Sequence, residues 1–187
     1  MPVVTTPRLI FAPTPLAVLR ERLVHHDFMA TVPLEDGAPE QSLSVHFSDE
    51  WPGEDALSLL PIWVTQREQA ANPGPWLDGV LIDRVDRLAV GSMGFKGAPD
   101  ARGSVEIGYS VNRSRRGRGY ATEMVKALTA WALRQPGVRR VIAECLESNV
   151  ASIRVLQKSG FARVGHRISD DGNLLLWEWS AADVEAT

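Results

Sequence analysis

The sequence predicts a single α/β domain over residues 1–187, with a mixed, mostly antiparallel central sheet flanked by helices and one central βαβ unit. The chain has the length of one domain, and 44% of its residues are hydrophobic, which is enough for a core. In the middle of the chain, apolar residues recur with the two-residue period of strands. Residues 121–134 instead follow the period of an amphipathic helix. Strands are predicted on both sides of that helix, and a right-handed crossover would make them parallel.

The first helix is predicted from its capping residues and its leucines. Thr14 is a suitable N-cap for the segment TPLAVLRERLVHH. Pro15 suits the first helical position, where its missing N–H loses no bond. Leu16, Leu19 and Leu23 fall on one face, so we expect them to face the core.

The remaining elements follow from changes of period along the chain. Residues 30–53 are rich in Pro, Gly, Asp and Glu and predict no definite element, while residues 54–69 form a helix that Pro61 should kink or split. Short turns within residues 76–111 favour an antiparallel meander, and Gly160 ends the last helix. The predicted strands are 8–12, 76–83, 88–95, 104–111, 140–146, 161–168 and 174–179, and the later helices are 121–134 and 150–159.

Composition excludes several classes of protein. The net charge of -3 gives the whole chain no general affinity for polyanions. A lone cysteine rules out an internal disulfide and fits a reducing cytoplasm. We find no signal-peptide pattern, no apolar run long enough to span a membrane, and no histidine spacing typical of a metal site. We therefore expect a cytoplasmic protein without a metal.

The segment NRSRRGRGYATEMVKAL, residues 112–128, indicates a phosphate site. A helix N-terminus carries unpaired N–H groups and about half a positive charge, which favours a bound anion. Gly117 and Gly119 allow a sharp turn and a close approach to a ligand. Arginines 115, 116 and 118 add donors suited to phosphate oxygens.

Other kinds of phosphate site fit this segment less well. A P-loop requires Gly-Lys-Ser/Thr, which GRGYAT lacks, and Thr122 stands where a dinucleotide fingerprint requires its third glycine. A nucleic-acid arm using Arg113 and the three arginines after it is the alternative. We disfavour it because such arms are usually disordered and repeated, whereas this segment occurs once and continues into a helix.

Three segments resemble the GNAT superfamily of N-acetyltransferases. RGRGYA, residues 116–121, matches the Arg/Gln-x-x-Gly-x-Gly/Ala signature, and VEIGYSV before it resembles the fourth strand of that fold. ESNVASIRVLQKSGF, residues 147–161, and the opening TPRLIF are similar to the branch of ribosomal-protein-alanine N-acetyltransferases. The resemblance implies a GNAT-like fold and acetyl-CoA as the cofactor.

The resemblance also implies where the coenzyme lies. Its pyrophosphate would rest on the backbone amides of the loop, and its pantetheine arm would pair with the edge of the strand around Val111. Asn149 matches a family residue near the pantetheine or acetyl group, although Asn is also a common N-cap. The implied cofactor-binding residues are Val111, Arg116, Gly117, Arg118, Gly119, Tyr120, Ala121, Asn149 and Ser152.

Ser152 is the candidate catalytic contact to the leaving sulfur. Many relatives carry a tyrosine four residues before the glycine of GF, and here that position is Leu156. The ribosomal branch instead places a serine one turn earlier, which matches Ser152. The alternative is that Ser152 only hydrogen-bonds the first turn of its helix. Cys145 as an acetyl carrier is disfavoured, because a lone strand cysteine is usually inert core.

Two carboxylates are candidates for the general base. Glu106 lies inside a central strand, with its side chain on the face of the sheet opposite to that of Val105 and Ile107. Glu144 lies on the next parallel strand. An α-amino group with a pKa near 8 is already partly neutral at pH 7, so a carboxylate acting through water would suffice. The alternative for each is an ion pair with an arginine.

The predicted function is N-acetyl transfer, in which a primary amine attacks the bound thioester directly. The acceptor is a protein N-terminus or a small amine, and its pocket is expected within residues 30–78, where Trp51, Trp63 and Trp76 either wall the pocket or pack in the core. A non-catalytic acyl-CoA-binding sensor of the same fold is the alternative. Trp177 and Trp179 share a face that is either buried or forms a homodimer contact.

Overall fold

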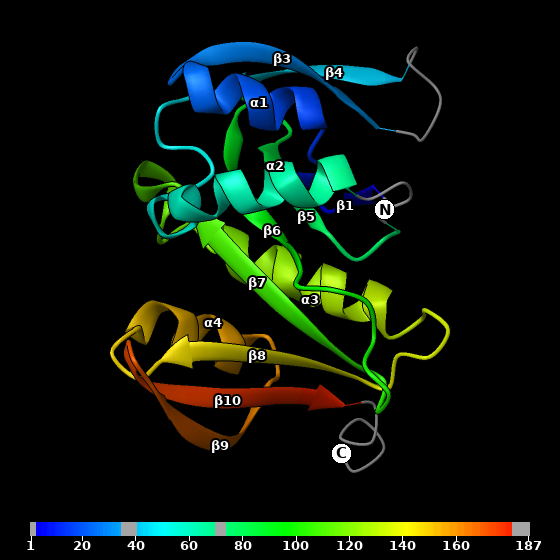
Figure 1. The fold of residues 1–187 in the computed structure, drawn as a ribbon, viewed down its shortest axis with the longest axis vertical. Coiled ribbons are helices and arrows are strands. Elements are labelled where there is room, and N and C mark those ends of the chain that lie inside the picture. The colour runs from blue at the N-terminus through cyan, green and yellow to red at the C-terminus, as the bar shows by residue number, and fades with distance from the viewer. Residues whose placement is uncertain (1–2, 35–40, 70–73, 181–187) are drawn as a thin grey trace.

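The computed structural model describes residues 3–34, 41–69 and 74–180. An eight-stranded sheet runs through the molecule in the order β1-β2-β5-β6-β7-β8-β10-β9 (Figure 1). All neighbours in it are antiparallel except β7 and β8, so the predicted mixed sheet and its βαβ unit are confirmed. Its strands are β1 Val4–Thr5, β2 Leu9–Pro13, β5 Asp78–Asp83, β6 Ala89–Phe95, β7 Ser104–Val111, β8 Arg140–Leu146, β9 Ala162–Ser169 and β10 Gly172–Ser180.

Helices cover both faces of this sheet, and each face has its own apolar core. Helices α1 (Leu16–Val24) and α2 (Leu60–Gln69) lie on one face, and α3 (Tyr120–Ala132) and α4 (Val150–Lys158) lie on the other. The stripe predicted for α3 is largely buried, with Met124, Val125 and Leu128 fully covered. The two faces are thereby separated by the sheet, which is a layered α/β arrangement.

The strands β7 and β8 part after three residue pairs. Their parallel register runs from Ser104 opposite Arg140 to Glu106 opposite Ile142. Beyond that point β7 continues to pair with β6 as far as Val111, but no described strand pairs with it on its β8 side. Figure 1 shows the two strands diverging from a common end. One edge of β7 is therefore available for an extended ligand.

The predicted start of α1 is wrong, and its predicted leucine face is confirmed at Leu19, which is buried, but not at Leu23. The N-cap is Pro15, not Thr14, and no side chain caps the helix. Leu23 is 51% exposed, whereas Arg22 is buried. The guanidinium of Arg22 donates to the carbonyl oxygens of Trp51 at 2.6 Å and Asp49 at 2.8 Å. A charged residue can take the inward position because these carbonyls satisfy it, and leucine spacing alone cannot reveal them.

The region without a predicted element contains a second, two-stranded sheet. Strands β3 (Phe28–Pro33) and β4 (Ser42–Phe47) form an antiparallel pair. After them, the 3-10 helix η1 (Glu54–Leu59) gives way to α2 one residue before Pro61, so the predicted split is confirmed. Proline is tolerated there because the first turn of a helix lacks internal N–H bonds.

The tryptophans are mainly core residues. Trp51 is fully buried and its indole N–H donates to the carbonyl of Gly91 at 3.0 Å. Trp76 packs against Phe95 and Trp131. Trp177 is buried, and Trp179 packs against the same core. The face that these last two residues share is thus the buried one.

Candidate functional site

The glycine-rich loop has the geometry of an anion site. It runs through the short 3-10 helix η2 (Arg113–Arg115) and ends at the N-cap of α3. Gly117 and Gly119 have φ angles of +76° and +81°, which favour glycine. No side chain caps α3, and a Cβ added at Gly117 would meet nothing within 4 Å. The N-terminus of α3 therefore faces open space, as an incoming phosphate requires.

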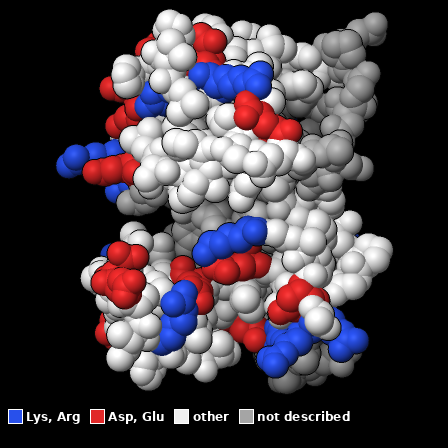
Figure 2. Space-filling view, viewed as in Figure 1, with Lys and Arg blue, Asp and Glu red and all other residues white. Residues whose placement is uncertain are grey.

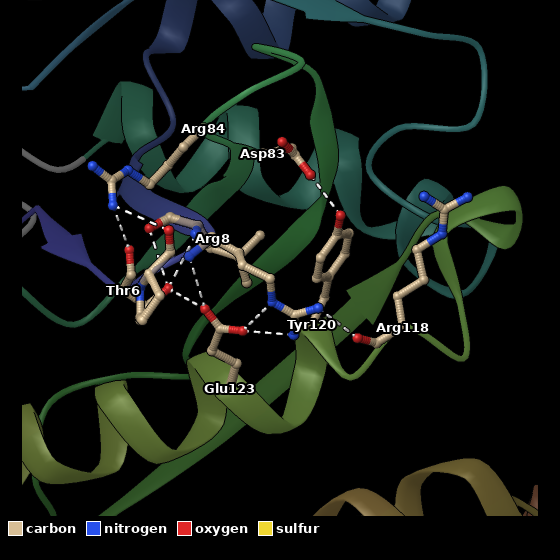
Figure 3. A network of polar contacts seen from close by, with 9 residues as sticks. Thr6, Arg8, Asp83, Arg84, Arg118, Tyr120 and Glu123 are labelled. Carbon is tan, nitrogen blue, oxygen red and sulfur yellow. Dashed lines mark hydrogen bonds and ion pairs between the residues drawn. The ribbon is translucent and has the colours of Figure 1, made fainter.

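Residues near the start of the chain form a network of hydrogen bonds and ion pairs with this loop and with α3 (Figure 3). Glu123, in the first turn of α3, accepts hydrogen bonds from the Thr6 hydroxyl at 2.7 Å and from Arg8 Nε at 2.7 Å. Burial disfavours its charge, but these hydrogen bonds hold the pKa of Glu123 below its ordinary value. Tyr120 completes the network, since its hydroxyl donates to Asp83 at 2.5 Å.

Arg8 also fixes the orientation of one peptide in the loop. Its Nη1 donates to the carbonyl oxygen of Arg118 at 2.9 Å, and its guanidinium lies 4.9 Å from the centre of the Tyr120 ring. In a trans peptide the carbonyl and the following N–H point in opposite directions. Arg8 therefore holds the N–H of Gly119 pointing away from the network, toward the open side of the loop.

We expect Arg8→Met to weaken the binding of coenzyme A about tenfold, because losing a charge-assisted hydrogen bond costs about 1.5 to 3 kcal/mol. Titration calorimetry measures the change. Arg84→Met is the matched control, since Arg84 donates to the carbonyls of Thr6 and Pro7 but does not contact the loop. An unchanged dissociation constant for Arg8→Met, with only a lower melting temperature, would mean that Arg8 serves stability alone.

The open edge of β7 brings Tyr109 and Ser152 together. The Tyr109 hydroxyl donates to the carbonyl oxygen of Ser152 at 3.4 Å, and burial raises the pKa of Tyr109 to about 12. Asn149 caps α4, since its side-chain oxygen accepts from the Ser152 N–H at 3.0 Å. Leu156 is buried in the core and offers no donor. Sequence reasoning missed Tyr109, because only the fold places it beside α4.

The two candidate bases lie on the same face of the sheet, where β7 and β8 part. Glu106 forms an ion pair with Lys96, and Glu144 forms one with Arg167 at 2.6 Å. Hydrogen bonds from Arg167 hold the pKa of Glu144 below its ordinary value. Ion pairing was the alternative for both residues and it occurs, although the partner of Glu106 is a lysine.

A cavity of about 360 Å³ lies between α2 and the strands β6 and β7. It reaches Gly108, Tyr109 and Ser110, on the stretch of β7 that has left β8. Figure 2 shows this side of the molecule hollowed between the upper part, which carries α2, and the lower part, with charged side chains along the lower edge. The cavity therefore opens beside the free edge of β7.

Comparison with known proteins assigns the family. Residues 34–162 match the model of the "Acetyltransferase (GNAT) domain" family, which is more than half of the chain. The chain belongs to the GNAT acetyltransferase family. It is 31% identical over 139 residues to the "Uncharacterized N-acetyltransferase YjdG" of Bacillus subtilis (strain 168), covering 70% of this chain and 81% of YjdG. The GNAT resemblance and the acetyltransferase activity expected from the sequence are confirmed.

Solved GNAT structures share the fold. The ribosomal-protein-S5-alanine acetyltransferase of Vibrio fischeri superposes with a TM-score of 0.61 at 15% identity, over 97% of each chain. The aminoglycoside acetyltransferase AAC(6')-Ib, solved in complex with coenzyme A, superposes with a TM-score of 0.53 at 20% identity, over 72% of this chain and 94% of that chain. Acetyl-CoA is the acyl donor of the GNAT family.

The residues of this GNAT protein fit coenzyme A. The loop from Arg116 to Ala121 presents the start of α3 to open space, and the β7 edge beside it lacks a strand partner. Among the loop arginines, Arg115 pairs with Asp86 at 2.7 Å and Arg116 Nε donates to the carbonyl of Val111 at 3.0 Å. The first bond ties the loop to the turn between β5 and β6, and the second ties it to the end of β7.

The remaining sequence-based expectations concern Cys145, a metal site and membrane-spanning helices. Cys145 is buried, and burial raises the pKa of its thiol, which disfavours a thiolate nucleophile. Within residues 3–34, 41–69 and 74–180, no cluster of His, Cys, Asp or Glu is placed to hold a metal ion. Of the helices in those ranges, none has the length and apolar character needed to cross a membrane.

Proposed function

We propose that this chain transfers the acetyl group of acetyl-CoA to a primary amine that attacks the thioester directly. One observation carries the proposal: the cavity between α2 and the sheet opens onto the stretch of β7 that has left β8. A coenzyme arm on that edge and an amine in the cavity would meet without an intermediate carrier. Bound acetyl-CoA supplies an activated acyl group and a thiolate leaving group. The lone cysteine fits a reaction in the cytoplasm.

Glu106 is the proposed base. It lies two residues before Gly108 on the same face of β7, beside the cavity, and Lys96 pairs with it at the rim. A carboxylate there accepts a proton from an ammonium group through water. Glu144 is the weaker candidate, because Arg167 binds it through two hydrogen bonds and lowers its pKa.

Ser152 and Tyr109 are the proposed contacts to the leaving sulfur. Tyr109 lies on the stretch of β7 that has left β8, and its hydroxyl donates to the backbone carbonyl of Ser152 in α4. With its pKa near 12, the phenol stays protonated at neutral pH and can donate a hydrogen bond there. Since the reference pKa of a thiol is about 8.5, a weak donor is sufficient.

The release of coenzyme A in the presence of amines tests the proposal. The protein is incubated with acetyl-CoA and a panel of peptides with free N-termini and small primary amines, and the free thiol is followed with a chromogenic disulfide. We expect amine-dependent release for at least one member of the panel. Tight binding of acetyl-CoA by calorimetry, with no release for any amine, would favour the sensor instead.

A further inference from the structure

We propose that the acceptor is a compact primary amine with an apolar carbon skeleton, of the aryl- or branched-alkylamine class, and not a polycation. The inference rests on the proposed function and concerns the occupant of the cavity beneath α2. Its support is the chemistry of the cavity wall, the pairing of the charged groups on that wall, and the size of the space.

The wall of the cavity is mostly apolar. Helical residues form one side, including a partly buried indole, and strand residues with their preceding loop form the other. The apolar lining residues are Ala56, Leu59, Ile62, Trp63 and Leu77, together with Met93 and Phe95, which are buried in the core on the α3 side of the sheet. Leu59 and Ile62 are 40% and 52% exposed. When an apolar ligand covers such exposed apolar surface, the free energy of binding improves by about 25 cal/mol for each Å² removed from water.

The charges of the wall do not suit a polycation. Asp78 is the only carboxylate among the described lining residues, its side chain is 10% exposed, and it pairs with Arg67 at 3.2 Å. Its second oxygen is covered by protein and has no hydrogen-bond partner among the described residues. Lys96 also lines the space, and its ammonium group pairs with Glu106. Beyond Glu106, which lies beside the cavity and pairs with Lys96, a ligand with several ammonium groups would find no further accessible carboxylate among the described lining residues to replace its water.

The size of the space favours a compact acceptor group. The cavity has a volume of about 360 Å³. This volume lies at the lower end of the range for small-molecule pockets. A ring or branched chain with a short amine tail fills such a space, whereas most of a longer peptide would remain outside it.

Two facing glycines make the floor of the cavity. Gly94 on β6 pairs with Gly108 on β7, and both line the space. A Cβ at Gly108 would approach nothing closer than the Lys96 side chain, at 3.9 Å. Larger side chains at this position therefore enter the cavity without meeting the backbone, which makes Gly108 a position for a blocking substitution.

The experiment compares 2-phenylethylamine and isoamylamine with spermidine, kanamycin and a peptide that begins with alanine. We expect kcat/KM for the two apolar amines to exceed that for the other three at least tenfold. Gly108→Val should raise KM for the apolar amines at least tenfold and should change the Kd of coenzyme A much less, although Gly108 lies on the β7 edge expected to bind the coenzyme arm. Gly165→Val is the matched control, because Gly165 lies on β9 with its nearest neighbouring side chain at 3.7 Å, and it should match the unaltered protein.

Calorimetry with the protein saturated in coenzyme A separates the two proposals. Binding of 2-phenylethylamine that Gly108→Val removes, without turnover of any amine, would overturn the proposed function and keep the inference about the occupant. Faster turnover of spermidine, kanamycin or the peptide, or an unchanged KM in Gly108→Val, would overturn the inference and keep the acetyltransferase function.

Discussion

Gly119→Glu is expected to abolish detectable binding of acetyl-CoA while the domain still folds. The substitution adds a carboxylate at the N-cap of α3, next to the expected diphosphate, and its Cβ would lie 3.5 Å from Nη2 of Arg8, the residue that orients the loop. Two like charges about 4 Å apart cost about 4 kcal/mol near a protein surface, which corresponds to a loss of affinity of more than about 100-fold. Replacing glycine by another residue at φ +81° costs about 1 to 2 kcal/mol of stability. Calorimetry and thermal unfolding measure the two effects.

Two further variants separate charge from backbone strain. Gly119→Ala carries the same strain without the charge and should bind at least ten times more tightly than Gly119→Glu. Gly137→Glu adds the same residue at φ +82°, in open space between α3 and β8, and should bind normally. Normal binding by Gly119→Glu would remove the helix start from the coenzyme site.

Glu106→Gln is expected to lower kcat/KM about 100-fold at pH 7, within the range that general bases contribute, without changing the affinity for coenzyme A. The defect should shrink as the pH rises toward the pKa of the acceptor amine, because more of the amine is then neutral without help. A pH profile of initial rates with the best acceptor measures this dependence.

The ion pair with Lys96 requires its own control. Lys96→Met breaks the pair but keeps the carboxylate, so it should retain most of the activity. Glu144→Gln should have a smaller effect than Glu106→Gln, since Arg167 already lowers the basicity of Glu144. If Glu106→Gln and Lys96→Met lose activity equally and without pH dependence, Glu106 only maintains the structure at the rim.

The features that the sequence could predict are those set by neighbouring residues. The two loop glycines have the left-handed conformation that their place between a strand and a helix suggested. Asn149 caps the helix that follows it, and Pro61 marks the change from 3-10 to α-helix. Each depends on chemistry within one turn of the chain, which is visible in a local pattern.

The features that it could not predict depend on contacts between distant residues. The Arg8 side chain meets Glu123 across 115 positions of sequence, and Tyr109 meets Ser152 across 43. Arg22 is buried because carbonyls of another segment surround its guanidinium. Glu123, in the first turn of α3, was the one local sign of its network with Thr6 and Arg8. An acidic residue at that position is equally well explained by its favourable interaction with the helix dipole.

The place of the C-terminal strand has a consequence for how the protein is made. Although β10 is last in sequence, it lies between β8 and β9, and β9 pairs with no other described strand. On the ribosome, β9 therefore emerges before the neighbour it needs, and Trp177 reaches the core later still. We expect the part of the sheet formed by β8, β9 and β10 to assemble only after β10 has been synthesised, and nascent chains stalled before Gly172 to depend on chaperones.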